Sequence, residues 1–263
     1  MDLLKSMAKM KKRTSQASNV MRLVLLASFV ILLFCPSAYA ATVYVKEGNV
    51  FFEDDGKVSQ ITSSGRDEKA ILNPSGTWIC FVRNLYQCDK DKCTPLKGVD
   101  VKDGNLKQEL WRVKTNGQNA AMLFLSKESA GVVGDNQSYS FASIENIQFS
   151  PSGDKVYFET PNWVTSAGLH VMNADGSGEK LLGAGNDTKI ILSSSGVDSE
   201  KHNGYQGYIV TDQHRYWYFG GSYDWYYLFT PDFKEVGPLG DDPNSFTDIG
   251  QLRYTDHSET KTK

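Results

Sequence analysis

Short runs of apolar, aromatic and β-branched residues alternate along the chain with clusters of Gly, Pro, Asn and Asp. Two stretches that begin 77 positions apart are nearly the same, LNPSGTWICF (72–81) and FSPSGDKVYF (149–158). In each, Pro-Ser-Gly predicts a tight turn, because Pro fixes φ and Gly accepts a positive φ. The runs that follow are rich in residues that favour strands. The pattern therefore predicts an internal repeat of sheet-forming units.

A second likeness lies downstream of each copy. The stretch ELWRVKTNGQNAAML (109–123) parallels GLHVMNADGSGEKLL (168–182). Asn116-Gly117 and Asp175-Gly176 are strong hairpin signals between two strand-like runs. Each unit therefore reads strand, Pro-Ser-Gly turn, strand, loop, strand, Asx-Gly turn, strand. This order predicts a four-stranded antiparallel meander.

Weaker copies of the unit lie at both ends of the chain. TVYVKEGNVFFEDDGKVSQIT (42–62) predicts three short strands, whereas 207–221 and 224–240 stand where the two hairpins of a last unit would be. FTDIGQLRY (246–254) is a further strand that could complete the first unit and close a ring by pairing the two ends of the chain. Closure would remove exposed strand edges. Weak strand signals in 183–206 leave room for part of a fifth unit.

The fold prediction is an all-β chain that forms a small β-propeller of about four four-stranded antiparallel blades. One blade cannot bury both of its faces alone, so copies packed around an axis give each sheet a neighbour. Alternate apolar residues of the repeated strands would line the cores between blades: Trp78, Cys80, Val82, Val156 and Phe158.

The units FSPSGDKVYFETP…GLHVMNADGSGEKLL and LNPSGTWICFVRN…ELWRVKTNG resemble the WD40-like propeller repeats of TolB-type periplasmic proteins. The good match covers about half of the chain after residue 40. The resemblance implies β-propeller blades in an exported protein. Such blades occur in transport scaffolds, sensors and peptidase accessory domains, so it implies no single function. About four units instead of six, and no separate N-terminal α/β domain, indicate a TolB-like protein rather than TolB itself.

The first forty residues predict a secretory signal peptide. A basic start is followed by the apolar run LVLLASFVILLF (23–34) and by Ala38-Tyr39-Ala40, a small-x-small cleavage site. The run is short for a bilayer span, so we expect no stable membrane insertion after cleavage; an uncleaved anchor is the alternative. The expected organisation is 1–40 signal peptide, 41–255 β-propeller and 256–263 flexible C-terminal tail. The expected location is periplasmic or secreted.

Charge narrows the class of partner. The whole chain has 28 basic and 31 acidic residues, and the leader holds six of the basic and one of the acidic residues. The mature part therefore keeps 22 and 30, a net charge of −8, with no Lys/Arg cluster. An acidic surface without a basic stripe argues against nucleic acid or an anionic membrane as the partner.

Three cysteines remain after cleavage. Cys88 and Cys93 flank a short polar loop and, in an exported protein, are expected to form a disulfide. Free thiols and a metal site are the alternatives, although no second Cys/His pair lies nearby at zinc spacing. Cys80 lies in the apolar run WICFV and is expected to be a small buried hydrophobe. We expect no metal, no cofactor and no catalytic residues.

The stretch YWYFGGSYDWYYLF (216–229) has nine aromatic residues in fourteen positions. Packing in the core of a blade explains such a composition. The functional interpretation is an exposed aromatic patch for binding, with Tyr223, Asp224 and Trp225 in a loop after Gly220-Gly221, together with Tyr226, as the candidate residues. Both interpretations stay open on sequence alone.

Three functions follow from these features. The favoured one is an exported, non-enzymatic β-propeller that binds a protein or peptide partner in the cell envelope through a face decorated by loops 84–108 and 126–143. The second is a module that binds a glycan or small ligand through the 216–229 region. The third is a propeller enzyme, a lyase or hydrolase, in which Asp212, His214 and Arg215 would converge with an acid from another blade.

Overall fold

A computed structural model describes residues 41–89, 92–100, 105–126, 140–192 and 204–244 of the 263-residue chain. The expected leader (1–40), the C-terminal strand (246–254), the expected tail (256–263) and most of the loop at 126–143 lie outside the described residues. Within the described residues, no helix is long and apolar enough to serve as a membrane span.

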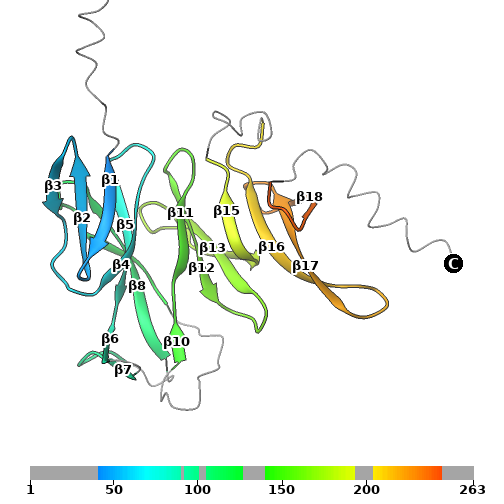
Figure 1. The fold of residues 1–263 in the computed structure, drawn as a ribbon, viewed down its shortest axis with the longest axis horizontal. Helices are drawn as coiled ribbons and strands as arrows, with labels where there is room; N and C mark the ends of the chain where they lie inside the picture. The colour runs from blue at the N-terminus through cyan, green and yellow to red at the C-terminus, as the bar shows by residue number, and fades with distance from the viewer. Residues whose placement is uncertain (1–40, 90–91, 101–104, 127–139, 193–203, 245–263) are drawn as a thin grey trace, which may run out of the picture. The chain divides into compact units, whose positions relative to one another are not determined.

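The described chain folds into four successive antiparallel sheets and one small hairpin (Figure 1). The first sheet contains β1 (Thr42–Lys46), β2 (Asn49–Asp54) and β3 (Lys57–Gln60). The second contains β4 (Asp67–Leu72), β5 (Trp78–Asn84), β8 (Asn105–Lys114) and β9 (Ala121–Leu125), and β10 (Ser140–Ala142) adds to it in parallel beside the start of β8. The third contains β11 (Glu145–Phe149), β12 (Lys155–Pro161), β13 (Ala167–Asn173) and β14 (Lys180–Ala184). The fourth contains β15 (Asn186–Ile190), β16 (Ile209–Tyr216), β17 (Ser222–Phe229) and β18 (Glu235–Gly240). The hairpin is formed by β6 (Tyr86–Asp89) and β7 (Lys92–Pro95).

The predicted repeat is confirmed in the second and third sheets. Their Pro-Ser-Gly turns have the same geometry, with Gly76 at φ 69° and Gly153 at φ 74°. In each turn the glycine N–H donates to the carbonyl oxygen three residues earlier, at 2.9 Å. The residue before the proline also caps the turn, because Asn73 Oδ1 accepts from Thr77 N at 2.8 Å and Ser150 Oγ accepts from Lys155 N at 3.0 Å.

The fourth sheet belongs to the same repeat although it lacks the Pro-Ser-Gly motif. Strands β4, β11 and β15 each begin their sheet, and each carries a register shift at the same place in its pairing with the next strand. At these bulges Lys69, Asn146 and Asp187 have positive φ values of 53°, 47° and 45°, which non-glycine residues adopt rarely. Residues 186–190 therefore supply the first strand of the fourth sheet, and 207–221 does not form the predicted turn hairpin. It supplies β16 and the turn that follows it.

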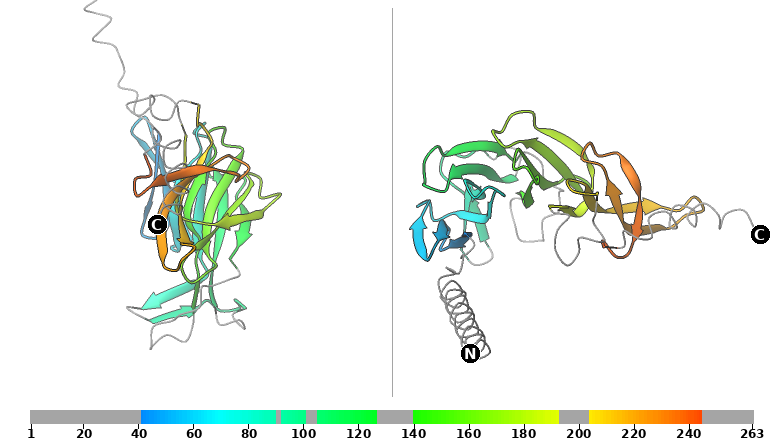
Figure 2. Two further views of the ribbon diagram at one scale, coloured as in Figure 1. Left: turned by 90° about the vertical axis from the view of Figure 1, so that its right-hand side faces the viewer. Right: turned by 90° about the horizontal axis from the view of Figure 1, so that it is seen from above.

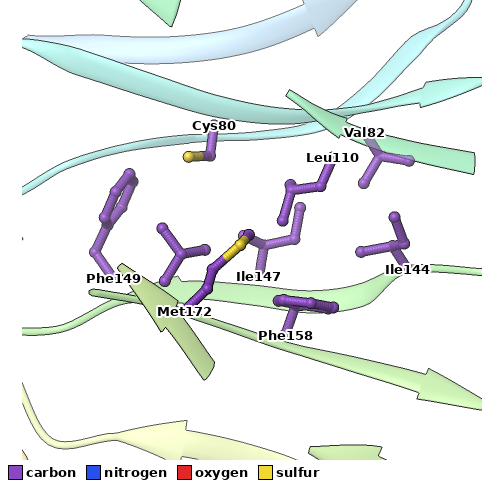
Figure 3. Packing of buried hydrophobic residues seen from close by; sticks show 9 residues of the cluster. Cys80, Val82, Leu110, Ile144, Ile147, Phe149, Phe158 and Met172 are labelled. Atoms are coloured by element: carbon purple, nitrogen blue, oxygen red, sulfur yellow. The ribbon is translucent and has the colours of Figure 1, made fainter. Parts of the chain in front are cut away.

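Apolar side chains fill the space between successive sheets. Strand β5 alternates, so that Ile79 and Phe81 pack in one cluster with Val50 of the first sheet, whereas Cys80 and Val82 face the third sheet. Figure 3 shows the cluster between the second and third sheets. Its buried members are Cys80, Val82, Leu110, Ile144, Ile147, Phe149, Val156, Phe158 and Met172. A third cluster, which includes Leu169 and Tyr227, joins the third sheet to the fourth.

Four of the five predicted core residues are in these clusters, and Trp78 is the exception. Its side chain is half-buried and lies beside Arg112, whose guanidinium carbon is 4.7 Å from the centre of the ring. Trp78 stands at the first position of β5, where the sheet has just left the turn. The end of a strand has fewer neighbours than its middle, so the ring packs on a cation instead of entering the core.

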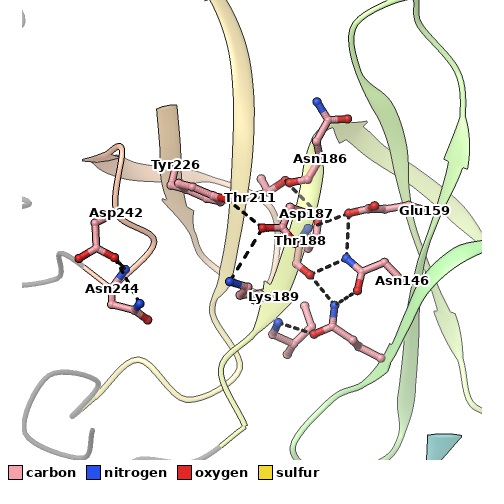
Figure 4. Close-up of polar contacts among 12 residues, drawn as sticks. Asn146, Glu159, Asn186, Asp187, Thr188, Lys189, Thr211, Tyr226, Asp242 and Asn244 are labelled. Atoms are coloured by element: carbon pink, nitrogen blue, oxygen red, sulfur yellow. Dashed lines mark hydrogen bonds and ion pairs between the residues drawn. The ribbon is translucent and has the colours of Figure 1, made fainter. Parts of the chain in front are cut away.

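Polar bonds also join the third and fourth sheets, as Figure 4 shows. Asn146 Nδ2 and Gln148 Nε2 both donate to the carbonyl oxygen of Thr188, at 2.6 and 2.5 Å. The amide N–H of Thr188 donates to Glu159 Oε1 at 2.8 Å. Because both backbone groups of Thr188 are satisfied by the neighbouring sheet, the first strand of one sheet is held in register with the next.

Ring closure between the first and last sheets is not seen among the described residues. The first sheet has three strands there, in the order β1-β2-β3, and it stays separate from the fourth sheet. The strand expected to complete it lies outside the described residues, so the predicted closure and the blade count stay predictions.

Cys80 is buried, as the sequence predicts, and only 1 % of its surface is exposed. Burial raises the pKa of the thiol to about 12, and this effect outweighs the opposite influence of the Arg112 charge. Because the thiolate is the reactive form, the folded mature chain should not react with iodoacetamide at pH 8, whereas urea-unfolded protein should gain one label by mass spectrometry. Rapid labelling of the native protein would contradict this burial.

Candidate functional site: an exposed aromatic hairpin

The hairpin of β16 and β17 projects the aromatic stretch from the fourth sheet. The strands pair from Ile209↔Phe229 to Tyr216↔Ser222, and the turn between them ends on two glycines. Gly220 and Gly221 have φ values of 99° and 88°, which favour glycine. The turn is closed by two backbone bonds of 3.1 Å, from Trp217 N to Gly221 O and from Gly220 N to Trp217 O. The turn therefore has a defined conformation.

The aromatic stretch divides into a buried half and an exposed half. Tyr227 and Phe229 are in the core, with 1 % and 5 % of their surfaces exposed. By contrast, residues 216–219, which we call the aromatic tip, are exposed: Tyr216 by 73 %, Trp217 by 43 %, Tyr218 by 92 % and Phe219 by 81 %. Core packing thus explains why Tyr227 and Phe229 are aromatic, but it does not explain the aromatic residues of the tip.

The four candidate residues lie on β17, so the loop expected for Tyr223, Asp224 and Trp225 is wrong. Tyr223 and Trp225 point to one face of the strand, where both are half-buried. Their rings support Trp217 of the tip, with centroids 4.3 Å from Tyr223 and 6.1 Å from Trp225. Tyr223 and Trp225 also contact each other at 5.0 Å. These rings fix the position of Trp217, so they act as the base of the aromatic tip.

Asp224 and Tyr226 lie on the opposite face of β17. Asp224 Oδ1 is 2.7 Å from His214 Nδ1 on the paired strand. The Tyr226 hydroxyl donates to Asp187 Oδ2 at 2.8 Å, and this bond is the main reason why the pKa of Tyr226 rises to about 12. Both side chains are therefore engaged within the fourth sheet.

The three residues named for a catalytic alternative do not converge. Asp212 and His214 share one face of β16, and Arg215 lies on the other, where its guanidinium carbon is 3.6 Å from the centre of the Tyr227 ring. Burial raises the pKa of Asp212, and the nearby charges of Asp224 and Asp187 raise it further. Those acids belong to the same sheet. Across the described residues, no group of three or more His, Cys, Asp or Glu side chains is placed to hold a metal ion.

The predicted disulfide between Cys88 and Cys93 is present, and it joins directly paired residues of β6 and β7 with a Cα–Cα distance of 4.0 Å. This excludes the free-thiol and metal alternatives for the pair. The hairpin is inserted between the second and third long strands of its sheet, β5 and β8. Residues 162–166 and 217–221 occupy the same position in the third and fourth sheets.

These three connections lie along one edge of the sheets, at the lower side of Figure 1, and we call this edge the loop edge. The views in Figure 2 show the sheets following one another in chain order. Sequence reasoning anticipated the contributions of 84–108 and 216–229, but it missed Trp163 and Val164, which are 44 % and 98 % exposed on the loop edge. The signal available in the sequence was the apolar Trp163-Val164 pair directly after the turn-favouring Pro161-Asn162.

Comparison with known proteins gives structural likeness only. No protein-family model matches the chain, and no curated protein sequence matches it. Similar solved structures include oligogalacturonate lyase in complex with manganese, with a TM-score of 0.47 at 12 % identity over 76 % of this chain and 50 % of that one. The tricorn protease has a TM-score of 0.45 at 10 % identity over 76 % of this chain and 15 % of the protease.

The β-propeller domain of the trilobed protease from Pyrococcus furiosus has a TM-score of 0.43 at 8 % identity, over 77 % of this chain and 53 % of that domain. This chain thus spans between 15 % and 53 % of the length of these three structures.

Proposed function

We propose that this protein is an exported, non-enzymatic scaffold that binds a protein or peptide partner of the cell envelope through the loop edge, with the aromatic tip as its main contact. The four sheets act in this proposal as blades of a β-propeller of TolB-like type. The observation that carries it is the exposure of four consecutive aromatic side chains, 43 % to 92 %, at the end of a hydrogen-bonded hairpin.

Exposed aromatic rings favour a binding role because they leave apolar surface in water. Contiguous apolar patches on soluble proteins mark interaction sites, and Tyr and Trp are the residues that most often dominate the energy of protein interfaces. Trp217 is held by Tyr223 and Trp225 at ring distances of 4.3 and 6.1 Å. A held ring loses little entropy on binding, so the support increases affinity.

The surroundings of the aromatic tip suggest the chemistry of the partner. Asp224 lies close to the turn of the hairpin, two residues after Ser222, with 60 % of its side chain exposed. The mature chain has a net charge of −8. A partner surface with an apolar centre and basic groups at its rim would complement this region.

A glycan is the second candidate ligand, and one observation favours it. Trp217, Tyr223 and Trp225 form a cluster of three rings on one face of the hairpin. Aromatic rings with one exposed face can pack against the apolar side of a sugar. Protein binding is preferred because the most exposed residues, Tyr218 and Phe219, lie at the end of the turn instead of lining a groove.

The test is a crosslinking pull-down from the cell envelope with tagged mature protein, followed by identification of the captured proteins by mass spectrometry. The variant Tyr218→Ser/Phe219→Ser removes the two most exposed rings, whose side chains are not in the core. Met122→Ser, on β9 of the second sheet and 48 % exposed, is the matched control. The partner should be enriched by the wild type and the control, and lost by the double variant.

A purified partner then allows a quantitative test. Loss of the two rings should weaken its binding by about 30-fold or more, because truncation of an interface hot spot costs about 2 kcal/mol or more. Equal capture by the double variant and the wild type would contradict the site. Capture of no protein, together with binding of the tip to a glycan array, would favour the second candidate. If the wild type binds neutral phosphatidylcholine vesicles and neither a protein nor a glycan, both the protein-binding and the glycan-binding proposals are contradicted.

A further inference from the structure

A cleft lies on the loop edge between the third and fourth sheets, and none of its lining residues belongs to the aromatic tip. Its volume is about 310 Å³, and the residues that give it chemical character are Glu145, Glu159, Trp163, Val164, Thr165 and Asn186. They come from the start of β11, from β12, from the loop 162–166 and from the start of β15. This volume is at the small end of ligand sites, so it suits one side chain or a molecule of similar size.

Two carboxylates line the cleft directly opposite each other. Glu145 and Glu159 are paired residues of β11 and β12, and like charges in such cross-strand positions repel. Glu159 is 6 % exposed, and its two hydrogen bonds, from Thr188 N and Asn146 Nδ2, both fall on Oε1. Among the described residues, Glu159 Oε2 therefore accepts no hydrogen bond and is available to a ligand.

Among the residues that the structure describes, one lysine partly compensates the charge of this pair. Lys69 Nζ lies 2.6 Å from Glu145 Oε2 and also contacts Glu68 at 3.5 Å. The ion pair engages one oxygen of Glu145 and none of Glu159. The pair of carboxylates thus keeps an excess of negative charge at the cleft, and a bound cation would relieve it.

The other wall of the cleft is a loop whose conformation is fixed. Trp163 N donates to Ser166 O at 2.9 Å, which closes a turn. Asn186 of the fourth sheet holds the loop from both sides, since its Oδ1 accepts from Ala167 N at 2.8 Å and its Nδ2 donates to Thr165 O at 3.0 Å. These bonds present Trp163 and Val164 at the cleft without the entropy cost of ordering a free loop.

We propose that this cleft binds a protonated amine or guanidinium group carried on an apolar stem, such as the side chain of lysine or arginine in a peptide. The cation would pair with Glu159 Oε2 and Glu145, and the stem would pack against Trp163 and Val164. Carboxylates form strong charge-assisted hydrogen bonds with such cations, and indole rings attract them. The inference does not depend on the aromatic tip, because it uses different residues and names a different chemistry.

The test uses the mature chain, residues 41–263, and isothermal titration calorimetry with three probes. The first is the peptide acetyl-Gly-Lys-Gly-amide, the second is its norleucine counterpart, which keeps the stem and lacks the charge, and the third is n-butylamine. The lysine peptide should bind saturably. Its affinity should fall in 1 M NaCl, because salt screens charge interactions. The norleucine peptide should bind at least tenfold more weakly. If butylamine and the lysine peptide bind with equal affinity, the ligand of the cleft is a free amine. If the peptide binds more tightly, the ligand is a side chain within a peptide.

Three variants connect the binding to the cleft. Trp163→Leu should lower the affinity for the lysine peptide roughly fivefold or more, because it removes the indole ring that the cation contacts. Glu159→Gln keeps an acceptor for Thr188 N and removes the charge, and it should weaken binding further. Lys69→Met keeps the length of the stem and frees Glu145, so it should strengthen binding, which a damaged protein would not do. Met122→Ser, on β9 of the second sheet and outside both proposed sites, is the control and should leave the affinity unchanged.

The proposal is overturned if the norleucine and lysine peptides bind alike, or if no amine binds saturably. It is also overturned if the Trp163→Leu and Glu159→Gln variants unfold at the same temperature as the wild type and bind the lysine peptide with the same affinity. A failed pull-down with the aromatic tip would leave these titrations unaffected, so the two proposals can fail separately.

Discussion

Replacing Phe158 with alanine should lower the free energy of unfolding by about 3–5 kcal/mol, the usual cost of removing a buried phenylalanine. Phe158 is 0 % exposed and lies in the cluster between the second and third sheets (Figure 3). Its ring stacks on His170 with centroids 5.0 Å apart and an interplanar angle of 9°, and it contacts Phe124 at 4.8 Å. Alanine would leave a cavity with rigid walls, because the residues around it come from two sheets.

Equilibrium unfolding in urea, followed by near-UV circular dichroism and tryptophan fluorescence, measures this change. Met122→Ala, on the nearby strand β9 but 48 % exposed, is the matched control and should change the stability by about 0.5 kcal/mol or less. A loss below about 1 kcal/mol for Phe158→Ala would mean that the second and third sheets do not share a core. The cleft depends on that core, since Glu145 and Glu159 lie on β11 and β12, the strands that supply Ile147 and Phe158 to it.

Replacing Asp67 with alanine should cost about 3–5 kcal/mol, because it leaves the charge of Arg83 without its buried partner. The Asp67 side chain is 0 % exposed, and that of Arg83 is 19 % exposed. The pair is bidentate, with Nε–Oδ1 at 2.6 Å and Nη2–Oδ2 at 3.0 Å. The Arg83 guanidinium also lies over the Trp111 ring at 4.9 Å, so it cannot turn toward water without losing that contact.

The same unfolding experiment provides two comparisons for Asp67. The double variant Asp67→Leu/Arg83→Leu should be less destabilised than Asp67→Ala, because no unpaired charge remains. Glu235→Gln, which breaks the exposed pair with Arg215 at 2.7 Å, should cost about 1 kcal/mol or less. If Asp67→Ala and Glu235→Gln had similar small effects, the Asp67–Arg83 pair would not be a buried interaction.

Much of the fold could be predicted because its signals are local. The Pro-Ser-Gly turns at 74–76 and 151–153 act through the φ preferences of two residues, and they identify β5 and β12 directly. The first strand of the fourth sheet, NDTKI (186–190), carries no such turn. It is defined by pairing with β16, more than eighteen residues away, and by bonds to Asn146 and Gln148 of the third sheet.

The aromatic hairpin shows the same division within one stretch. Its composition indicated a patch of interest, and Gly220-Gly221 indicated a turn. Alternation along a strand predicts two faces, but it does not tell where the strand passes beyond the packed sheets. Tyr227 is buried because the third sheet covers it, whereas Tyr218 extends past the last residue that has a neighbouring sheet.

The sequence by itself determined the β class, the repeat and the region of the aromatic residues, and it favoured the Cys88–Cys93 disulfide, because each of these rests on the preferences of residues close together in the chain. Only the tertiary structure decided which aromatic rings are exposed and that Glu145, Glu159 and Trp163 share a cleft with Asn186. Exposure and clefts depend on which sheets pack together, and that packing is a property of distant residues rather than of any short stretch.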